Sequence, residues 1–200
     1  MTTPQDLLIV VLDEAAGHPV APGELSLALA GAELIDLLKT PTIRLDGGRI
    51  VPGHLPGPAD PLLTQAAAAL VMHEPYELVS DWLWRRGNSL ADTYMTALEA
   101  QGLLVRESRR LFRPGHRALA DSPSRHRAAK RWARAEPVLL ALMESLGISG
   151  KQANEPLHIT DYAVETVLAA VGTALQELQT ERQRRTIEQA AFDNLWRDPA

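Results

Sequence analysis

The chain has 200 residues, 46% hydrophobic and 22% charged, a composition typical of a globular domain rather than a disordered segment. It has no cysteine, which excludes disulfides, thiolate metal sites and cysteine nucleophiles and fits a reducing compartment. The net charge is −5, and no apolar run approaches the roughly 20 residues of a membrane span, so we expect a cytoplasmic protein.

The N-terminal part of the chain predicts two helices. The first covers Pro4 to Ala16, and the second runs from about Gly23 to Leu38. Apolar residues cover the second helix most of the way round, which predicts a place at the centre of the domain. Its main stripe and the adjoining face consist of Leu27, Leu34, Ile35 and Leu38, and of Leu25, Leu29 and Ala32.

A β-hairpin and a capped helix are predicted next. Two β-compatible runs, Thr42 to Leu45 and Arg49 to Val51, flank the turn sequence Asp46-Gly47-Gly48. Asp60 is then a plausible N-cap, because Pro61 follows it at the first helical position.

Further helices follow towards the middle of the chain. One is expected from Pro75 to about Arg86. Ser89 is expected to cap the next, with Asp92 completing a variant capping box, and Gly102 lies where this helix should end.

The second half predicts another hairpin and three helices. The hairpin turns near Arg113-Pro114-Gly115, and a basic helix starts at Ser122-Pro123 and stops near Pro137. An apolar helical run over Val138 to Leu146 and a helix from Thr160 complete the series, and residues 179–200 form a charged helical tail. We therefore expect one all-α domain over residues 1–200, mainly a helical bundle with one or two small β-hairpins.

Positive charge is concentrated between Arg106 and Arg134. This stretch holds ten Lys and Arg against two acids, Glu107 and Asp121, a local charge of +8, whereas the rest of the chain carries −13. Such segregation favours an anionic partner. The alternative is an ordinary solvated face of an arginine-rich protein.

The basic stretch divides into a hairpin and a helix. Arg127, Lys130, Arg131 and Arg134 share one helical face, beside an apolar one, as in helices that lie on anionic lipid. In the hairpin, guanidinium groups flank an apolar tip that predicts membrane contact or oligomer contact, or alternatively cross-strand core packing. The hairpin arginines are Arg106, Arg109, Arg110, Arg113 and Arg117, and the tip is Leu111, Phe112 and Pro114.

Catalytic chemistry has little support. The six histidines are dispersed, and no zinc-protease, nucleophile-elbow or dinucleotide-binding pattern is present. Gly147 to Lys151 ends like a phosphate loop, but Gln152 replaces the required Ser or Thr. The sequence predicts neither an enzyme nor a metal or cofactor.

Several segments, in order, resemble the Golgi phosphoprotein 3 family: GELSLALAGAELIDLL, DGGRIV, PADPLLTQAAAAL, SDWLWRR, ALEAQGLLVRE and AEPVLLALMESLG. The excess of arginine over lysine resembles a bacterial, actinobacterial-type branch. The resemblance implies one helical domain with a hairpin after Gly102 that contributes to oligomerisation and membrane contact. Eukaryotic members are peripheral membrane proteins that bind phosphatidylinositol 4-phosphate and act as trafficking adaptors for glycosyltransferases.

The sequence departs from the family where the lipid headgroup is bound. A tryptophan and three arginines of the family's pocket correspond to Ala21, Ala30, Asn88 and Ala91 here. A phosphomonoester needs charged donors, so the departure argues against phosphoinositide selectivity and for general anionic phospholipid. Arg85 and Arg86 are the nearby candidates to replace the lost charge.

Two other functions compete with this prediction. The chain could be a protein–protein interaction module that binds no lipid, with a cargo that the sequence does not identify. It could also be a winged-helix DNA binder that uses Ser89 to Glu99 and the basic hairpin. That helix has no Lys or Arg and carries Asp92 and Glu99, a poor surface for nucleic acid, so nucleic acid is an unexpected partner.

Overall fold

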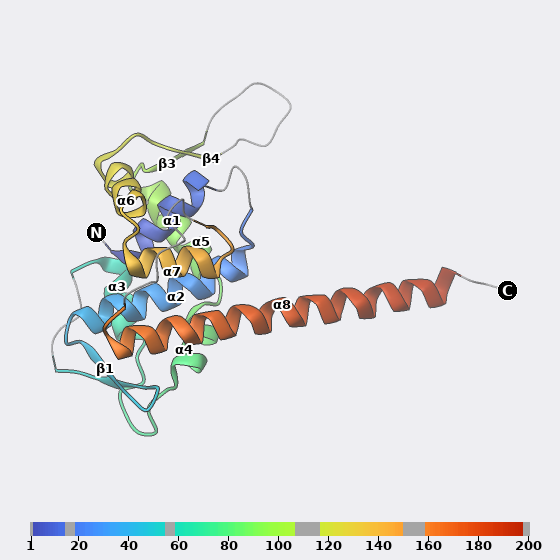
Figure 1. Cartoon of the computed structure of the whole chain (residues 1–200), viewed down its shortest axis with the longest axis horizontal. Helices are drawn as coiled ribbons and strands as arrows, with labels where there is room; N and C mark the ends of the chain where they lie inside the picture. The colour runs from blue at the N-terminus through green and yellow to red at the C-terminus, as the bar shows by residue number, and fades with distance from the viewer. Residues whose placement is uncertain (1, 15–18, 55–58, 107–116, 150–158, 198–200) are drawn as a thin grey trace.

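The structure, a computed structural model, describes residues 2–14, 19–54, 59–106, 117–149 and 159–197 (Figure 1). Within these residues the chain forms eight helices and two antiparallel two-stranded sheets, which confirms the predicted mainly helical fold. The helices are α1 (Thr3–Glu14), α2 (Pro22–Lys39), α3 (Pro61–Ala68), α4 (Val79–Arg86), α5 (Leu90–Ala100), α6 (Pro123–Ala133), α7 (Pro137–Ser145) and α8 (Tyr162–Arg197). The strands are β1 (Ile43–Asp46), β2 (Arg49–Pro52), β3 (Leu104–Arg106) and β4 (Arg117–Leu119).

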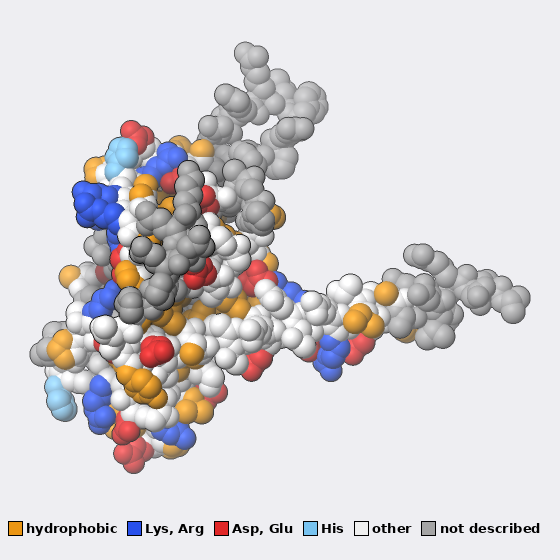
Figure 2. All heavy atoms as spheres, viewed as in Figure 1, with side chains coloured by type: hydrophobic (Ala, Val, Ile, Leu, Met, Phe, Trp, Pro, Cys, Tyr) orange, Lys and Arg blue, Asp and Glu red, His pale blue; other side chains and the backbone are white. Residues whose placement is uncertain are grey.

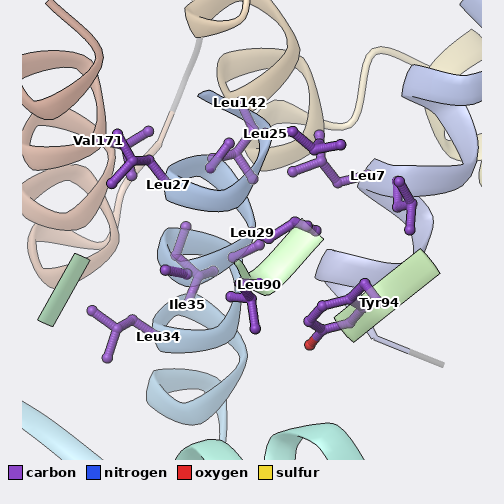
Figure 3. Close-up of a cluster of buried hydrophobic side chains, with 14 of the residues drawn as sticks. Leu7, Leu25, Leu27, Leu29, Leu34, Ile35, Leu90, Tyr94, Leu142 and Val171 are labelled. Carbon is purple, nitrogen blue, oxygen red and sulfur yellow. The ribbon is translucent and has the colours of Figure 1, made fainter. Parts of the chain in front are cut away.

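Helix α2 is the centre of the fold, as its apolar circumference predicts. Every residue from Leu25 to Leu37 is buried, and α1, α3, α4, α5, α7 and α8 all contact this helix. Figure 3 shows its leucines pointing outward in several directions, towards Leu7 of α1, Leu142 of α7 and Val171 of α8. Fully burying a leucine stabilises a fold by about 1.5–3 kcal/mol, so this helix organises most of the core.

Two acids interrupt the apolar surface of α2, and each has a partner on another helix. The carboxylate of Asp36 accepts hydrogen bonds from the backbone N–H and the hydroxyl of Thr3, at 2.5 and 2.6 Å, and from Lys39 at 3.0 Å. The first amides of a helix have no partner within the helix. Asp36 therefore caps α1 from α2, which explains how Thr3 can be buried.

The first sheet has the turn that its sequence predicts. β1 and β2 pair with Asp46 opposite Arg49, and Gly47 and Gly48 occupy the turn with φ angles of 53° and 77°. Positive φ at both central residues is the requirement of a type I′ hairpin turn, which glycine meets without strain.

The predicted start of two helices and the predicted end of a third are confirmed. Asp60 accepts from the backbone N–H groups of Leu62 and Leu63, and Ser122 accepts from that of Arg125 at 3.2 Å. At the end of α5, Gly102 has a φ of 68°, and the N–H of Leu103 donates back to the carbonyl of Leu98 at 2.9 Å. This is the Schellman arrangement that a glycine after a helix favours.

Two local predictions are wrong, and both are overridden by partners distant in sequence. Helix α4 begins at Val79 rather than Pro75, because Leu78 forms a β-bridge with Arg49 and so holds the preceding chain extended. Ser89 is the N-cap of α5, but its φ is 58° and its side chain makes no capping hydrogen bond. The hydroxyl of Ser26 on α2 instead accepts from the backbone N–H of Ala91 at 3.0 Å.

Helix α8 has two parts with different surroundings. Its first half packs on α2, α4 and α7 through residues such as Val167 and Val171, and an ion pair further along joins Arg182 to Glu24 of α2 at 2.7 Å. Beyond this point the helix continues away from the other elements (Figure 1), and Ile187 and Phe192 are 69% and 58% exposed. The part of the expected tail that the structure describes, up to Arg197, is therefore the second half of one continuous helix.

Candidate functional site

Helix α6 and its C-cap residue Arg134 carry five cations of the basic stretch, on two sides of the helix. Arg127, Lys130 and Arg134 are exposed and form what we call the outer face of α6. Figure 2 shows Lys and Arg side chains gathered on the surface over this helix. Arg125 and Arg131 turn instead towards α1, so the four-residue cationic face that the spacing predicts is divided between solvent and the protein interior.

Arg125 joins three elements. Its Nη2 and Nε donate to the carboxylate of Asp13 on α1, at 2.7 and 3.1 Å, and its Nη1 donates to the carbonyl of Leu119 in β4 at 3.3 Å. The hydrogen bond from this guanidinium to Asp13 raises the pKa of Arg125. The side chains of Arg125 and Asp13 remain 38% and 26% exposed. This contact therefore ties the start of α6 and the base of the second hairpin to the end of α1.

Arg131 forms a more deeply buried network. It donates to Asp6 of α1 at 2.6 Å and to Glu136, the N-cap of α7, at 2.8 Å. The Asp6 side chain is only 3% exposed. Because removing one partner of a buried pair leaves an uncompensated charge, Arg131 anchors α6 rather than presenting its guanidinium to solvent.

Arg86, a candidate replacement for the lost pocket charge, is occupied inside the protein. Its Nε and Nη2 donate to the two carboxylate oxygens of Glu33 at 2.8 and 2.9 Å, and the hydroxyl of Tyr94 donates to the same carboxylate at 3.1 Å. Glu33 is 0% exposed. Burial raises the pKa of Tyr94, so this phenol remains a proton donor.

Arg85 is closer to the surface but is also paired. It donates twice to the Glu77 carboxylate, at 2.7 Å each, and once to the carbonyl of Ala69, and its guanidinium lies 5.2 Å from the ring centre of Trp82. Its hydrogen bonds to Glu77 raise the pKa of Arg85, so it stays charged.

One of the four family pocket positions, Asn88, lines a hollow of about 530 Å³. Ala30 and Ala91 are 0% and 4% exposed and belong to the core. Among the described lining residues Arg85 is the one cation and Asp92 the one acid, which leaves no net positive charge for a phosphomonoester. The lining consists of Pro22, Gly23, Ser26, Leu27, Trp84, Arg85, Gly87, Asn88, Ser89, Asp92 and Leu178.

The second hairpin is described only at its base. β3 and β4 pair in an antiparallel register that places Arg106 opposite Arg117. The other predicted hairpin residues, Arg109, Arg110, Leu111, Phe112, Arg113 and Pro114, lie outside the described residues.

The carboxylates that hold α6 are not predicted by the sequence. Asp6, Asp13 and Glu14 all lie on α1, and Glu14 accepts a hydrogen bond from Nε1 of Trp132 at 3.2 Å. The acids on the first helix and the bases on a helix more than a hundred residues later are the signal that could have indicated this contact. Nothing in the local sequence pattern, however, pairs these two helices.

Three further observations concern nucleic-acid binding, metal binding and membrane spans. The exposed positions of α5 are Asp92, Thr93, Thr96 and Ala100, which offer nucleic acid no cation. Within the described part of the chain, no three His, Asp or Glu residues are grouped to hold a metal ion. Of the helices in the described ranges, none has both the length and the hydrophobicity of a membrane span.

Comparison with known proteins identifies the family. The family model described as Golgi phosphoprotein 3 (GPP34) matches residues 4–197, nearly the whole chain. A comparison with individual curated proteins gives no significant match. The chain therefore belongs to the Golgi phosphoprotein 3 family.

Proposed function

We propose that the chain is a peripheral membrane adaptor that contacts anionic phospholipid through α6 and the adjoining hairpin. Membership of the Golgi phosphoprotein 3 family supports an adaptor that is not an enzyme. The observation that carries the proposal is the outer face of α6, where Arg127, Lys130 and Arg134 are exposed. Helix α6 itself lies near β3 and β4 (Figure 1).

The number of cations in the basic stretch is sufficient for reversible attachment. Each basic residue near an anionic bilayer contributes about 1 kcal/mol. The three cations of the outer face, with the five arginines of the hairpin sequence, exceed the five or six that weak attachment requires. The attraction should fall with added salt, since it is spread over surface charges.

We propose that recognition depends on negative charge rather than on a phosphoinositide headgroup. The hollow at Asn88 offers Arg85 alone among cations of the described residues, and Glu77 already accepts two hydrogen bonds from that guanidinium. Phosphatidylinositol 4-phosphate should therefore increase binding no more than the same charge supplied as phosphatidylglycerol.

Vesicle flotation tests this function. The wild-type chain should float with vesicles of phosphatidylcholine and phosphatidylglycerol and not with phosphatidylcholine alone. Lys130→Glu/Arg134→Glu should bind at least about 30-fold more weakly, because two attractive charges of about 1 kcal/mol each are lost and two repulsive carboxylates replace them.

The matched control changes the same charge elsewhere. Arg44 and Arg49 are exposed on β1 and β2, away from α6 (Figure 1), and Arg44→Glu/Arg49→Glu should bind within about three-fold of wild type. Equal losses in both variants would mean that net charge alone decides binding. Equal flotation with neutral and anionic vesicles would rule the proposal out.

A protein-interaction module without lipid binding is the second candidate. The exposure of Ile187 and Phe192 on the projecting half of α8 favours it. A chain that fails to bind any vesicle while remaining folded would support this candidate instead.

A further inference from the structure

The ion pair with Asp13 neutralises Arg125, a cation of the basic stretch on α6. Arg125 lies in the first turn of α6 and reaches the carbonyl of Leu119 at the end of β4. Its side chain is 38% exposed. It therefore lies between the outer face of α6 and the hairpin, but its charge is neutralised by a carboxylate of the chain itself.

The placement of Asp13 is unfavourable for α1 alone. Asp13 and Glu14 are the last two residues of that helix, and α1 has no basic residue in its last turn. The C-terminal end of a helix carries partial negative charge, which acids oppose. These two acids are instead compensated by α6, through Arg125 and Trp132.

Few apolar side chains hold α6. Ala128 is its one fully buried residue and Trp132 packs partly buried against the core, while polar links from Arg125, Arg131 and Trp132 join the helix to α1. Elements with little apolar burial open locally at low free-energy cost. The two ends of α6 differ, however, because Arg131 pairs with the buried Asp6 whereas Arg125 pairs with the partly exposed Asp13.

We propose that Asp13 is an internal competitor for Arg125. It holds this guanidinium, the first turns of α6 and the base of the hairpin against α1 until phosphates of an anionic bilayer replace its carboxylate. The start of α6 and β4 then move about the anchor at Arg131, and Arg125 joins the lipid-contacting cations. This inference rests on the proposed function and adds to it one lipid-binding residue, Arg125, that Asp13 holds in the absence of lipid.

Hydrogen exchange on the full-length chain tests the internal half of the proposal. Without lipid, Asp13→Ala should speed amide exchange in residues 117–128 by about two- to five-fold, since a partly exposed ion pair contributes that much protection. Amides of α7 should not change. The matched control is Glu177→Ala, which alters net charge equally at an exposed position of α8.

Vesicle binding tests the other half. Asp13→Ala should bind phosphatidylglycerol vesicles about five-fold more tightly than Glu177→Ala, the gain from one additional cation. The gain should disappear in Arg125→Gln/Asp13→Ala compared with Arg125→Gln. Asp13→Asn repeats the test with a side chain of unchanged size. In wild type, phosphatidylglycerol vesicles should release the contact to Asp13 and so change exchange in residues 117–128, and inorganic phosphate at about 10-fold the lipid phosphate concentration should not reproduce that change.

The outcomes separate this inference from the proposed function. Wild-type binding without a gain in Asp13→Ala, or an equal gain in Glu177→Ala, overturns the inference alone. Unchanged exchange over residues 117–128 also overturns it. Failure of every variant to bind anionic vesicles overturns the proposed function, and the lipid exchange at Arg125 with it.

Discussion

Arg86→Met should lower the free energy of unfolding by about 3–5 kcal/mol at pH 7, because it leaves a buried charge without its partner. The substitution removes both guanidinium hydrogen bonds from a carboxylate that is 0% exposed. Among the residues that the structure describes, Tyr94 would remain as the hydrogen-bond donor to Glu33. Urea unfolding followed by circular dichroism measures the loss, and a deficit below about 1 kcal/mol would contradict it.

The loss of unfolding free energy caused by Arg86→Met should become smaller as the pH falls from about 8 to about 5. Burial raises the pKa of Glu33, and Arg86 opposes that shift. Without the guanidinium the folded-state pKa rises further above the unfolded value, so Glu33 takes up a proton on folding. Stability from such a group is present below the unfolded pKa and is lost as the pH rises through the folded pKa. The variant should therefore be least stable, relative to wild type, at the alkaline end.

A double variant distinguishes lost pairing from lost packing. Glu33→Gln/Arg86→Met leaves no charge at this site and keeps an oxygen that accepts from Tyr94, so it should recover at least half of the deficit. The free energy of unfolding of this double variant should no longer change with pH because of a group at position 33, since no titratable side chain remains there. A double variant as unstable as Arg86→Met would show that the arginine stem, rather than the ion pair, stabilises the packing of α4 on α2.

Local sequence patterns predict the ends of helices correctly where both hydrogen-bonding partners lie within a few residues of each other. Asp60, Ser122 and Gly102 cap or terminate their helices as expected, because each cap involves amides or carbonyls no more than five positions apart. The start of α4 and the cap of α5 differ from the prediction for the opposite reason. Their backbone groups are bonded by Gly48 and Ser26, and no pattern near Val79 or Ala91 contains those residues.

The candidate site shows the same contrast between local features, which the sequence predicts, and long-range contacts, which it does not. The sequence locates the basic stretch and the periodicity of α6, but its pattern makes Arg86 and Arg131 surface cations. Their partners, Glu33 and Asp6, lie 53 and 125 residues away. A glutamate flanked by apolar residues near the middle of α2 is the available signal, since a buried charge requires a partner. The identity of that partner follows only from the packing of α4 on α2.

Gly31→Ala should destabilise the fold by about 1–3 kcal/mol, although alanine is the better helix former by roughly 0.5–1 kcal/mol. Gly31 lies where α2 meets α8, and a Cβ there would overlap Cγ2 of Val171 and lie 3.7 Å from side-chain carbons of Leu83 and Val167. All three neighbours are fully buried, so none can swing into solvent. Thermal unfolding measures the loss.

Gly172→Ala is the matched control, because it makes the same substitution on the partner helix where a Cβ would meet nothing within 4 Å. It should stabilise the protein by up to about 1 kcal/mol through helix propensity alone. Val171→Ala should cost less in the Gly31→Ala background than in wild type, since it removes the overlapping methyl groups. If both glycine variants stabilise the protein, α2 and α8 do not require a side-chain-free contact at Gly31. Opposite signs would show that this glycine sets how closely α8 approaches the central helix.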